Sequence, residues 1–371
     1  WNNNLRSAFS ASPIIPVYDA DGNYNSTVNS DWNVNDGNPY GNMMVNRYNN
    51  SKNGSLDANV YVQIEPIKNL RFKTVYDISY GASEYRAYTP KYQFTPQTAN
   101  TVSKVNQSHG HGLSMVWTNT LSYDFNIATE HHVNALIGSE LSTYDGSNTE
   151  GSNTGLIPGF DDWDHAYLVN TNGTENKTVK GSPYDSTRGM SYFARLGWTW
   201  KERYMVNATM RADGSSKFAK GNQWGFFPSA AVAWRISSES FMENTKNWLD
   251  DLKLRFSYGT AGNNNIPSGQ ISQLYELNKT PWINGVNSYI APSKYMANSD
   301  LTWETTITRN VGLDFTTLGG RLSGTIEGYW NNTKDLLIMF PTSGTGYNYQ
   351  YRNMGETENK GLEASVNWVA V

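Results

Sequence analysis

The sequence predicts an all-β fold, specifically a transmembrane antiparallel up-and-down β-barrel. Three features of the 371 residues predict it: apolar and polar residues alternate with a period of two, the alternating segments are long, and short and long connections alternate between them. Successive side chains of a strand point to opposite faces, so this period indicates a sheet with one apolar and one polar face. A membrane barrel turns its apolar face to lipid and has tight turns at one end and longer loops at the other.

The alternation is clearest between residues 251 and 258. Its members run Asp251, Leu252, Lys253, Leu254, Arg255, Phe256, Ser257 and Tyr258. Similar stripes cover 192–200, 203–211 and 362–368. Each stripe is long enough to present one continuous apolar face.

Eleven segments show this pattern and are expected to be strands: 57–65, 70–80, 112–125, 131–142, 189–200, 203–212, 226–237, 251–259, 302–316, 321–332 and 358–369. Several exceed the 5–6 residues of an average soluble strand. They match the 9–11 residues that a tilted strand needs to cross a bilayer. The whole chain, 1–371, is therefore expected to belong to one barrel domain.

The connections give the predicted barrel its two ends. Short turns are expected at 66–69, 126–130, 201–202 and 317–320. Long external loops are expected at about 11–56, 81–111, 143–188, 260–301 and 333–357, and these segments are rich in Asn, Gly, Ser and Thr. The connection 238–250 differs, because the spacing of Phe241, Thr245 and Trp248 predicts one or two helical turns.

Side chains on the two faces are expected to meet different surroundings. Aromatic residues gather toward strand ends, as in the interfacial girdles of membrane barrels, although aromatic residues also favour strands in general. Examples are Trp198, Trp200, Trp224, Trp330 and Trp368. The polar residues opposite the apolar stripe are expected to face the lumen: Arg195, Arg211, Lys253, Arg255 and Glu327.

The composition excludes several other classes of protein. The absence of cysteine excludes disulfide scaffolds, cysteine zinc sites and thiol catalysts. A formal charge of -4 without a basic run disfavours nucleic-acid binding. The longest apolar runs have five residues, such as 336–340, whereas a membrane helix needs about 20. A mean hydropathy of -0.61 still suits a membrane barrel, because only alternate residues face lipid.

No metal or catalytic motif is complete in the sequence. Loops that begin at Asp19 and Asp31 carry alternating oxygen ligands but lack the glycine and glutamate of an EF-hand. His109 and His111 would share a strand face, but no third metal ligand is near. His165 stands in an acidic run that is typical of an external loop. Nothing fixes two carboxylates at the separation needed for glycoside hydrolysis. We expect no cofactor, no metal and no catalytic residue.

Two groups of residues remain candidates for ionic pairing or ligand contact. Arg211, Asp213 and Lys217 are expected to form an ionic cluster just beyond a strand. Aromatic rings in the long loops offer flat apolar faces with polar edges, which suit sugar rings. These candidate ligand-binding residues are Trp163, Trp282, Tyr347, Tyr349 and Tyr351.

An ordered set of short motifs resembles a known family. The motifs are PVYDADG at 16–22, SYFARLGW at 191–198, KERY at 201–204, RADGSSKF at 211–218, FPS at 227–229, AWRI at 233–236, SYG at 257–259, DLTWETT at 300–306, TKDLL at 333–337, NMGE at 353–356 and ENKG at 358–361. As a set spread over nearly the whole chain, they resemble the SusC/RagA-type TonB-dependent outer-membrane transporters of Bacteroidetes.

The resemblance implies location in the bacterial outer membrane and a 22-stranded barrel, of which eleven strands would be about half. It implies TonB-dependent uptake of oligosaccharides or peptides, with a SusD-like surface lipoprotein as a lid. The plug, the segment that contacts TonB and the last strands are expected to lie outside these residues, with both ends of the sequence being cuts.

Two alternatives come from other classes. One is a secreted β-sandwich or β-helix adhesin that binds sugars, which would share the richness in Asn, Gly and Tyr. The other is a β-rich glycoside hydrolase. The alternation of short and long connections favours the barrel, because a sandwich does not require it.

Overall fold

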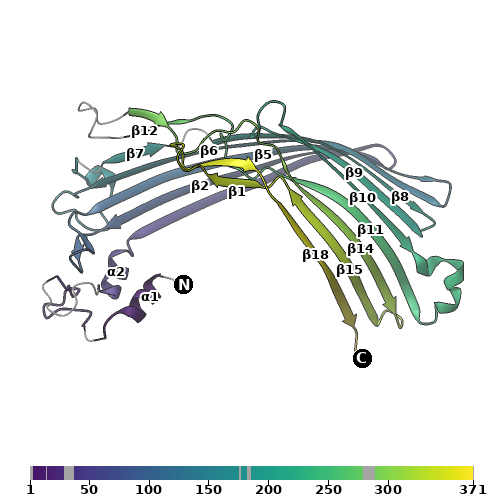
Figure 1. Ribbon diagram of the computed structural model, residues 1–371, viewed down its shortest axis with the longest axis horizontal. Coiled ribbons are helices and arrows are strands. Elements are labelled where there is room, and N and C mark those ends of the chain that lie inside the picture. The colour runs from purple at the N-terminus through teal and green to yellow at the C-terminus, as the bar shows by residue number, and fades with distance from the viewer. Residues whose placement is uncertain are drawn as a thin grey trace. The chain divides into compact units, whose positions relative to one another are not determined.

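Long strands dominate the computed structural model, which describes residues 3–13, 15–28, 37–174, 177–181, 185–278 and 289–370. The main sheet has 12 strands, and all but one follow one another in chain order from β1 to β18 (Figure 1). The remaining strand, β7, pairs with β6. The all-β prediction is confirmed, and the sheet as described is not closed, since β1 and β18 are its edges.

The strands of the main sheet have the following bounds: β1 (Asn49–Ile67), β2 (Leu70–Thr89), β5 (Lys104–Ile127), β6 (His131–Thr154), β7 (Thr178–Gly181), β8 (Asp185–Trp200), β9 (Tyr204–Ser215), β10 (Trp224–Arg235), β11 (Leu249–Asn263), β14 (Glu304–Thr317), β15 (Leu322–Lys334) and β18 (Glu356–Trp368). Every segment predicted to be a strand corresponds to one of these.

The connections contain short elements of their own. Three hairpins pair β3 (Tyr92–Gln93) with β4 (Ala99–Asn100), β12 (Tyr275–Asn278) with β13 (Tyr289–Pro292), and β16 (Leu337–Pro341) with β17 (Tyr349–Asn353). The helices are α1 (Asn3–Ser10) and α2 (Pro39–Val45), with 3-10 turns η1 (Leu168–Asn170), η2 (Ile236–Ser238) and η3 (Ser240–Thr245). The last two lie in the connection where helical turns were predicted. No helix in these described ranges is long and apolar enough to cross a membrane.

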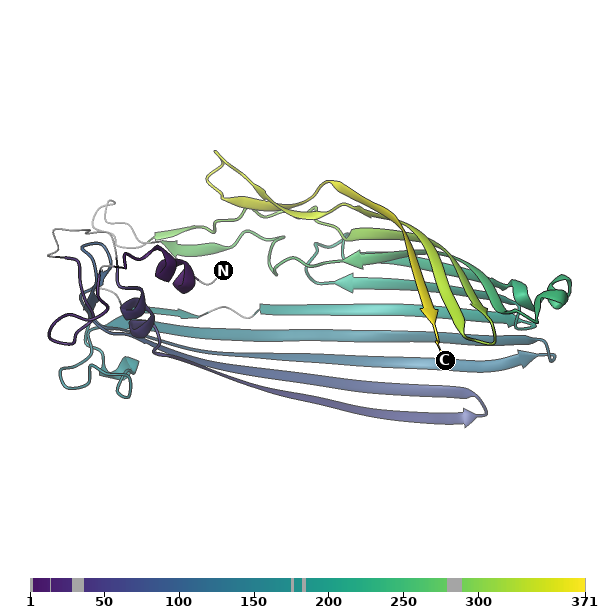
Figure 2. The ribbon, with the colours of Figure 1, turned by 90° about the horizontal axis from the view of Figure 1, so that it is seen from below.

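The chain divides into two compact units. Unit 1 comprises Trp1–Asp57, Ser79–Leu113 and Asp145–Asp185, and unit 2 comprises Ala58–Ile78, Ser114–Tyr144 and Ser186–Val371. Unit 2 contains the strands from β9 to β18 and almost all of β8. Figures 1 and 2 show β14, β15 and β18 side by side at its C-terminal end.

The pairing register of unit 2 gives its sheet two distinct faces. On one face, Leu196 lies opposite Ala208, Val232 opposite Phe256, and Ile326 opposite Ala364. We call this the apolar face, and its members are Tyr192, Ala194, Leu196, Met210, Phe226, Val232, Phe256, Val311, Ile326, Leu362 and Val366 with their same-face neighbours. Most of these large side chains are exposed. The residues between them form the polar face.

The buried cores lie under the loops. In unit 1, Tyr88, Val105, Leu156 and Ala166 form one core. In unit 2, Phe218, Ile266 and Leu301 form another, with Trp303 and Tyr351 packed against it. Parts of the long connections are therefore folded around small apolar cores, because burial of apolar side chains stabilises them.

The strands reaching into unit 1 are longer than predicted. β1, β2, β5 and β6 have 19, 20, 24 and 24 residues, so the loops expected at 81–111 and 143–188 begin with continued strand. Their extensions are rich in Ser, Asn, Gly and Thr and lack an apolar stripe. A strand whose side chains are mostly polar shows no apolar alternation, although its backbone can still pair with its neighbours. The period of two therefore ends before the hydrogen-bonded strands do.

Tight turns join strand pairs at one end of the sheet. Asn69, Lys201, Glu202 and Leu318 all have positive φ, between 52° and 66°. Hairpin turns of this handedness match the right-handed twist of the flanking strands. Short turns are thus confirmed at 66–69, 201–202 and 317–320, and Lys201-Glu202 is part of a three-residue connection between Trp200 and Tyr204. The fourth predicted turn, at 126–130, joins β5 to β6 and contains Ala128 with a φ of 54°.

Candidate functional site

The polar face of unit 2 collects all five residues that were predicted to face a lumen. Arg195 pairs with Thr209, Arg211 with Phe193, and Arg255 with Gly312. Gly312 pairs in turn with Glu327, and Lys253 lies two residues from Arg255 on the same strand. Because side chains two residues apart or directly opposite share a face, all five project from the side opposite the apolar stripe.

An ionic network links three strands on the polar face. The Arg255 guanidinium donates from Nε and Nη2 to the Asp314 carboxylate at 2.9–3.1 Å, and Nη2 also donates to Glu327. Lys253 Nζ lies 3.0 Å from Asp314 Oδ2. Asn310 donates to Glu327 at 3.2 Å, and Thr325 donates to Asp314 at 3.2 Å. Each carboxylate oxygen of this network therefore has a partner.

A second network surrounds Arg211. Its Nε donates to Asp213 Oδ1 at 2.6 Å, and its Nη2 donates to Glu140 Oε1 at 3.1 Å and to Ser191 at 3.0 Å. The predicted pairing of Arg211 with Asp213 is confirmed. The prediction was wrong for Lys217, whose Nζ donates to the Asn264 carbonyl at 3.4 Å. The chain turns away after Ser215, so Lys217 reaches the neighbouring loop instead of the strand.

Aromatic rings line the short-turn end of the sheet. His131, Trp200, Tyr204 and Trp234 stack in sequence across β6, β8, β9 and β10, with ring centroids 5.9, 5.4 and 6.5 Å apart. Tyr192 and Trp224 stack at 6.1 Å nearer the long-loop end. Rows of aromatic rings at both ends of an apolar band are typical of a membrane-spanning sheet.

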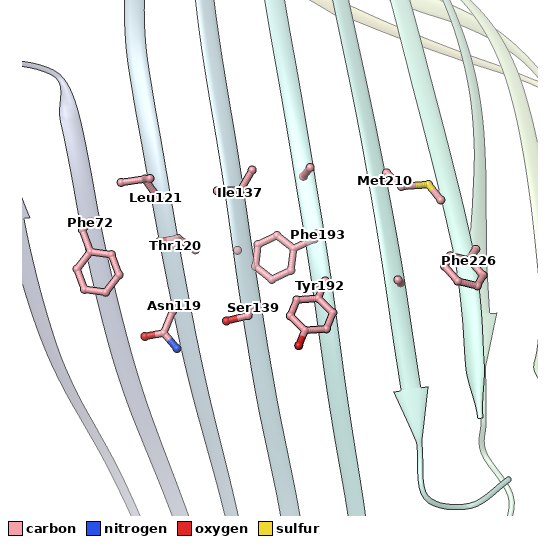
Figure 3. Close-up of a pocket in the computed structure, with 13 residues that line it drawn as sticks. Phe72, Asn119, Thr120, Leu121, Ile137, Ser139, Tyr192, Phe193, Met210 and Phe226 are labelled. Atoms are coloured by element: carbon pink, nitrogen blue, oxygen red, sulfur yellow. The ribbon is translucent and has the colours of Figure 1, made fainter. Parts of the chain in front are cut away.

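A groove is recessed into the apolar face between these rows, with a volume of about 550 Å³. Figure 3 shows Leu121, Ile137, Met210 and Phe226 around it. A second recess of about 650 Å³ shares Leu121, Ile137, Ala194 and Met210 with the first, so the two are continuous. The groove lies on the opposite face from the Arg255 network.

The loop aromatic Trp163 is already packed in unit 1. Its ring stacks on Tyr48 at 6.1 Å, and the Arg86 guanidinium lies 4.0 Å from the ring centroid. Tyr88 is buried beneath this pair and donates to Asp161. A cavity of about 700 Å³ borders these residues. Trp163 thus presents only part of its surface to that cavity.

Two of the other loop aromatics, Tyr349 and Tyr351, lie on β17 of unit 2. Tyr349 stacks on Tyr295 at 6.1 Å and meets Tyr351 edge-on at 6.2 Å. Tyr351 packs against the Phe218 core, and Tyr347 precedes the strand in a turn. Trp282 lies outside the described residues.

Among the residues considered for metals or acid–base chemistry, His111 and His165 have ordinary structural roles, and Asp31 lies outside the described residues. No group of three potential metal-ligating side chains occurs in the part of the chain that the structure describes. His111 stacks on Tyr80 at 6.5 Å and lies near Ser147. Hydrogen bonds from the His165 ring and backbone hold the pKa of Asp162 below its usual range. This pair closes a local turn in the loop.

Sequence reasoning predicted the face of Glu327 but not its pairing with Arg255, and it did not single out Asp314 or Glu140. Asp314 and Glu327 lie 59 and 72 residues from Arg255, and Glu140 lies 71 residues from Arg211. The period of two correctly predicts the face of each residue. It does not predict which residues are opposite, because that depends on the register between strands.

Comparison with known proteins identifies the family. A model of the family described as "TonB dependent receptor-like, beta-barrel" matches residues 1–370. The chain belongs to this TonB-dependent receptor family. It is 31% identical, over 97% of its length, to a TonB-dependent receptor of Formosa agariphila, of which it covers 36%. It is 42% identical, over 48% of its length, to TonB-dependent receptor SusC of Bacteroides thetaiotaomicron, of which it covers 18%.

Solved structures give the same fold. The RagAB peptide transporter aligns with 93% of the chain and 38% of that structure's chain, with a TM-score of 0.78 and 25% identity. The ferric-catecholate import receptor Fiu of E. coli aligns with 86% of this chain and 45% of its own, with a TM-score of 0.52 and 12% identity, which indicates the fold alone. The chain thus spans little more than a third of the relatives it matches along most of its length.

Family membership decides between the predicted classes. TonB-dependent receptors of the SusC and RagA type are outer-membrane β-barrel proteins, and the outer membrane is the location of this protein. The alternative of a secreted β-sandwich is wrong, since the long strands form one continuous sheet of the receptor fold. The family consists of receptors and transporters.

Proposed function

We propose that this TonB-dependent receptor imports oligosaccharides or peptides across the outer membrane, with a SusD-like surface lipoprotein as its lid. The family match over residues 1–370 carries the proposal. Identity to SusC and structural similarity to the RagAB peptide transporter support the SusC/RagA type. The energy would come through TonB, acting on a part of the receptor outside these residues.

We further propose that the sheet is about half of a 22-stranded barrel. Its eleven consecutive long strands are half of that number. The polar face, with the networks of Arg211 and Arg255, would line the lumen or contact a plug. The apolar face would meet lipid. The long loops at about 11–56, 81–111, 143–188, 260–301 and 333–357 would lie outside the cell.

Cargo contact is proposed for the loop aromatics Trp163, Trp282, Tyr347, Tyr349 and Tyr351. Their chemistry suits sugar rings or apolar peptide side chains. Tyr347 is the best test position, because the Tyr351 ring also supports the Phe218 core. Replacing Tyr351 would change the fold of the loop together with any contact to cargo.

Uptake by cells that produce the full-length receptor tests the function. Labelled oligosaccharides and peptides should accumulate in these cells, and accumulation should stop when the receptor gene is deleted or TonB is inactivated. Receptor-dependent uptake that persists without TonB would refute the proposal. A SusD-like lipoprotein should co-purify with the receptor, and its absence would refute the lid.

A second comparison tests the loop aromatics. Tyr347→Ala should lower uptake while leaving the amount of folded receptor unchanged. Tyr351→Ala should lower the amount of folded receptor, because it opens a cavity beside a buried core. Unchanged uptake in Tyr347→Ala would remove this residue from the cargo site without affecting the transport proposal.

A further inference from the structure

We propose that the groove on the apolar face of unit 2 is a binding site for one acylated, phosphate-bearing lipid of the outer membrane. The proposal depends on the membrane location and is independent of cargo and transport. Four observations carry it: the recess itself, its apolar lining, a row of polar side chains at one end, and an arginine beyond that row.

Small side chains create the recess. Ala194 and Ala212 lie on the apolar face where neighbouring positions carry Tyr192, Met210 and Phe226. The large neighbours are exposed, with 63% of Phe226 and 45% of Met210 accessible. The surface is therefore hollow between protruding side chains. Its volumes of about 550 and 650 Å³ are in the range that holds small ligands.

The lining separates into an apolar part and a polar end. Figure 3 shows Leu121, Ile137 and Met210 along one side, and Asn119, Ser139 and Tyr192 in a row nearer the end of β9, where the loop begins. The apolar part suits an alkyl chain. The polar row suits the ester or amide linkage of a lipid, because its amide and hydroxyl groups can donate to carbonyl oxygens.

The polar row of Asn119, Ser139 and Tyr192 has few hydrogen-bond partners of its own. In the part of the chain that the structure describes, the side chains of Asn119 and Ser139 have no hydrogen bond, and the Tyr192 hydroxyl has only a 3.9 Å contact with Met190 Sδ. A polar group left unpaired against hydrocarbon is costly. Asn119, Ser139 and Tyr192 lie on three adjacent strands, so the carbonyl oxygens of a lipid with several acyl linkages could accept hydrogen bonds from them.

Arg188 supplies a positive charge at the level expected for a phosphate. It lies on the same face of β8 as Tyr192, four residues nearer the loops, which is about 13 Å along a strand. Its guanidinium donates to the Tyr144 and Thr187 carbonyls, which hold its position. Cations near a membrane surface attract anionic headgroups. The order from loop to turn is therefore cation, polar row and apolar groove, which is the order of groups in a phosphorylated lipid.

Titration of the purified full-length receptor with lipid A, followed by native mass spectrometry, tests the site. Ala194→Phe fills the groove and should weaken lipid A binding about ten-fold, the effect of losing contact with roughly two methylenes. The matched control is Ala364→Phe, on the same face but on β18, away from the groove. This control should bind lipid A as the unaltered receptor does.

The headgroup is tested separately. Arg188→Gln should weaken binding of lipid A about five-fold, the effect expected of one cation near a lipid phosphate. It should leave binding of dephosphorylated lipid A unchanged.

Equal binding by Ala194→Phe and Ala364→Phe would overturn the groove as the site. An equal effect of Arg188→Gln on both lipids would overturn phosphate recognition. Uptake of cargo is a separate readout, so loss of the lipid site and failure of the transport proposal are distinguishable.

Discussion

Arg255 illustrates how a charged residue is held on a strand of unit 2. It contacts Asp314 on β14 and Glu327 on β15, so one guanidinium ties three strands together. The side chains of Arg255, Asp314 and Glu327 are 32%, 25% and 27% exposed. Partial exposure allows water to screen the charges, so the network contributes less than a fully buried one would.

Arg255→Gln should destabilise the receptor by about 1–2 kcal/mol, because it leaves two half-buried carboxylates with fewer partners. Asp314→Asn in the same background should cost less than it does alone, which would show coupling of the pair. Urea unfolding of the single and double variants measures both effects. The control is Arg195→Gln on the same face, since Arg195 has no ion pair within the described ranges. Equal costs for Arg195→Gln and Arg255→Gln would contradict this role.

Glu239 joins two strands at the short-turn end, outside the strands themselves. Its carboxylate accepts hydrogen bonds from Tyr204 Oη at 2.7 Å, Trp234 Nε1 at 3.0 Å and Arg203 Nη1 at 3.3 Å. The hydrogen bond from Tyr204, followed by that from Trp234, lowers the pKa of Glu239. The ionised carboxylate therefore stabilises the turn.

A lowered pKa gives this stabilisation a definite pH dependence. It is fully present above the ordinary glutamate pKa of about 4.3, and it is lost as the pH falls through the lowered pKa of the folded state. The unaltered receptor should exceed Glu239→Gln in unfolding temperature at about pH 7, and the difference should shrink toward about pH 3. A difference that stays constant over this range would contradict the assignment.

Close packing between strands depends on glycine at particular positions. Gly138 on β6 leaves room for the Phe193 ring of β8. A Cβ at this position would lie 2.4 Å from that ring and 2.9 Å from the Asn119 carbonyl oxygen on β5. The ring could move, but the backbone oxygen is fixed by the sheet. The Phe193 ring on β8 thus covers Gly138 on the neighbouring strand β6.

Gly138→Ala should therefore destabilise the receptor by about 1–3 kcal/mol, the usual cost of overpacking. Gly81→Ala on β2 is the matched control, because a Cβ added to Gly81 would have no other atom within 4 Å in the described part of the chain. That change should be neutral or slightly stabilising, since alanine restricts the unfolded chain. The urea concentrations at the unfolding midpoints of the two variants are compared. Equal midpoints would contradict the expectation that a Cβ at position 138 clashes with Phe193.

At the scale of elements, the period of two predicted every long strand of the sheet. It predicted strand ends well only where one face is apolar. β11 and β15 extend a few residues beyond their predicted ends, whereas β6 extends by twelve and β1 begins eight residues earlier. The residues of those extensions are polar on both sides. Backbone hydrogen bonds, which any sequence can make, continue the ladder there.

At the scale of the whole molecule, one face of the sheet carries apolar side chains and the other carries polar side chains. Phe256 projects from the apolar face and Ser257 from the polar face of the same strand. The two side chains are neighbours in sequence but would meet lipid and lumen, respectively, in the proposed barrel. They provide a direct test of that arrangement.

Phe256→Arg should impair folding into a bilayer by about 2–4 kcal/mol if the residue lies near the membrane midplane, because a charge on the lipid face is desolvated. Ser257→Arg should have a much smaller effect, since its surroundings are polar. Folding of the full-length receptor into vesicles, measured by urea titration, compares the two. Equal penalties would contradict the assignment of the two faces.

The sequence by itself determined the strand order, the face of each residue in the segments with an apolar stripe and, through ordered motifs, the family. These properties are local: side-chain direction follows from the pleat, and motifs are read along the chain. Only the tertiary structure decided which acid meets Arg255, where Lys217 points, how far β6 extends and where the apolar face is hollow. Each of these depends on the register between strands and on side chains that are distant in sequence. The residue pattern within one strand predicts neither the register nor the distant contacts.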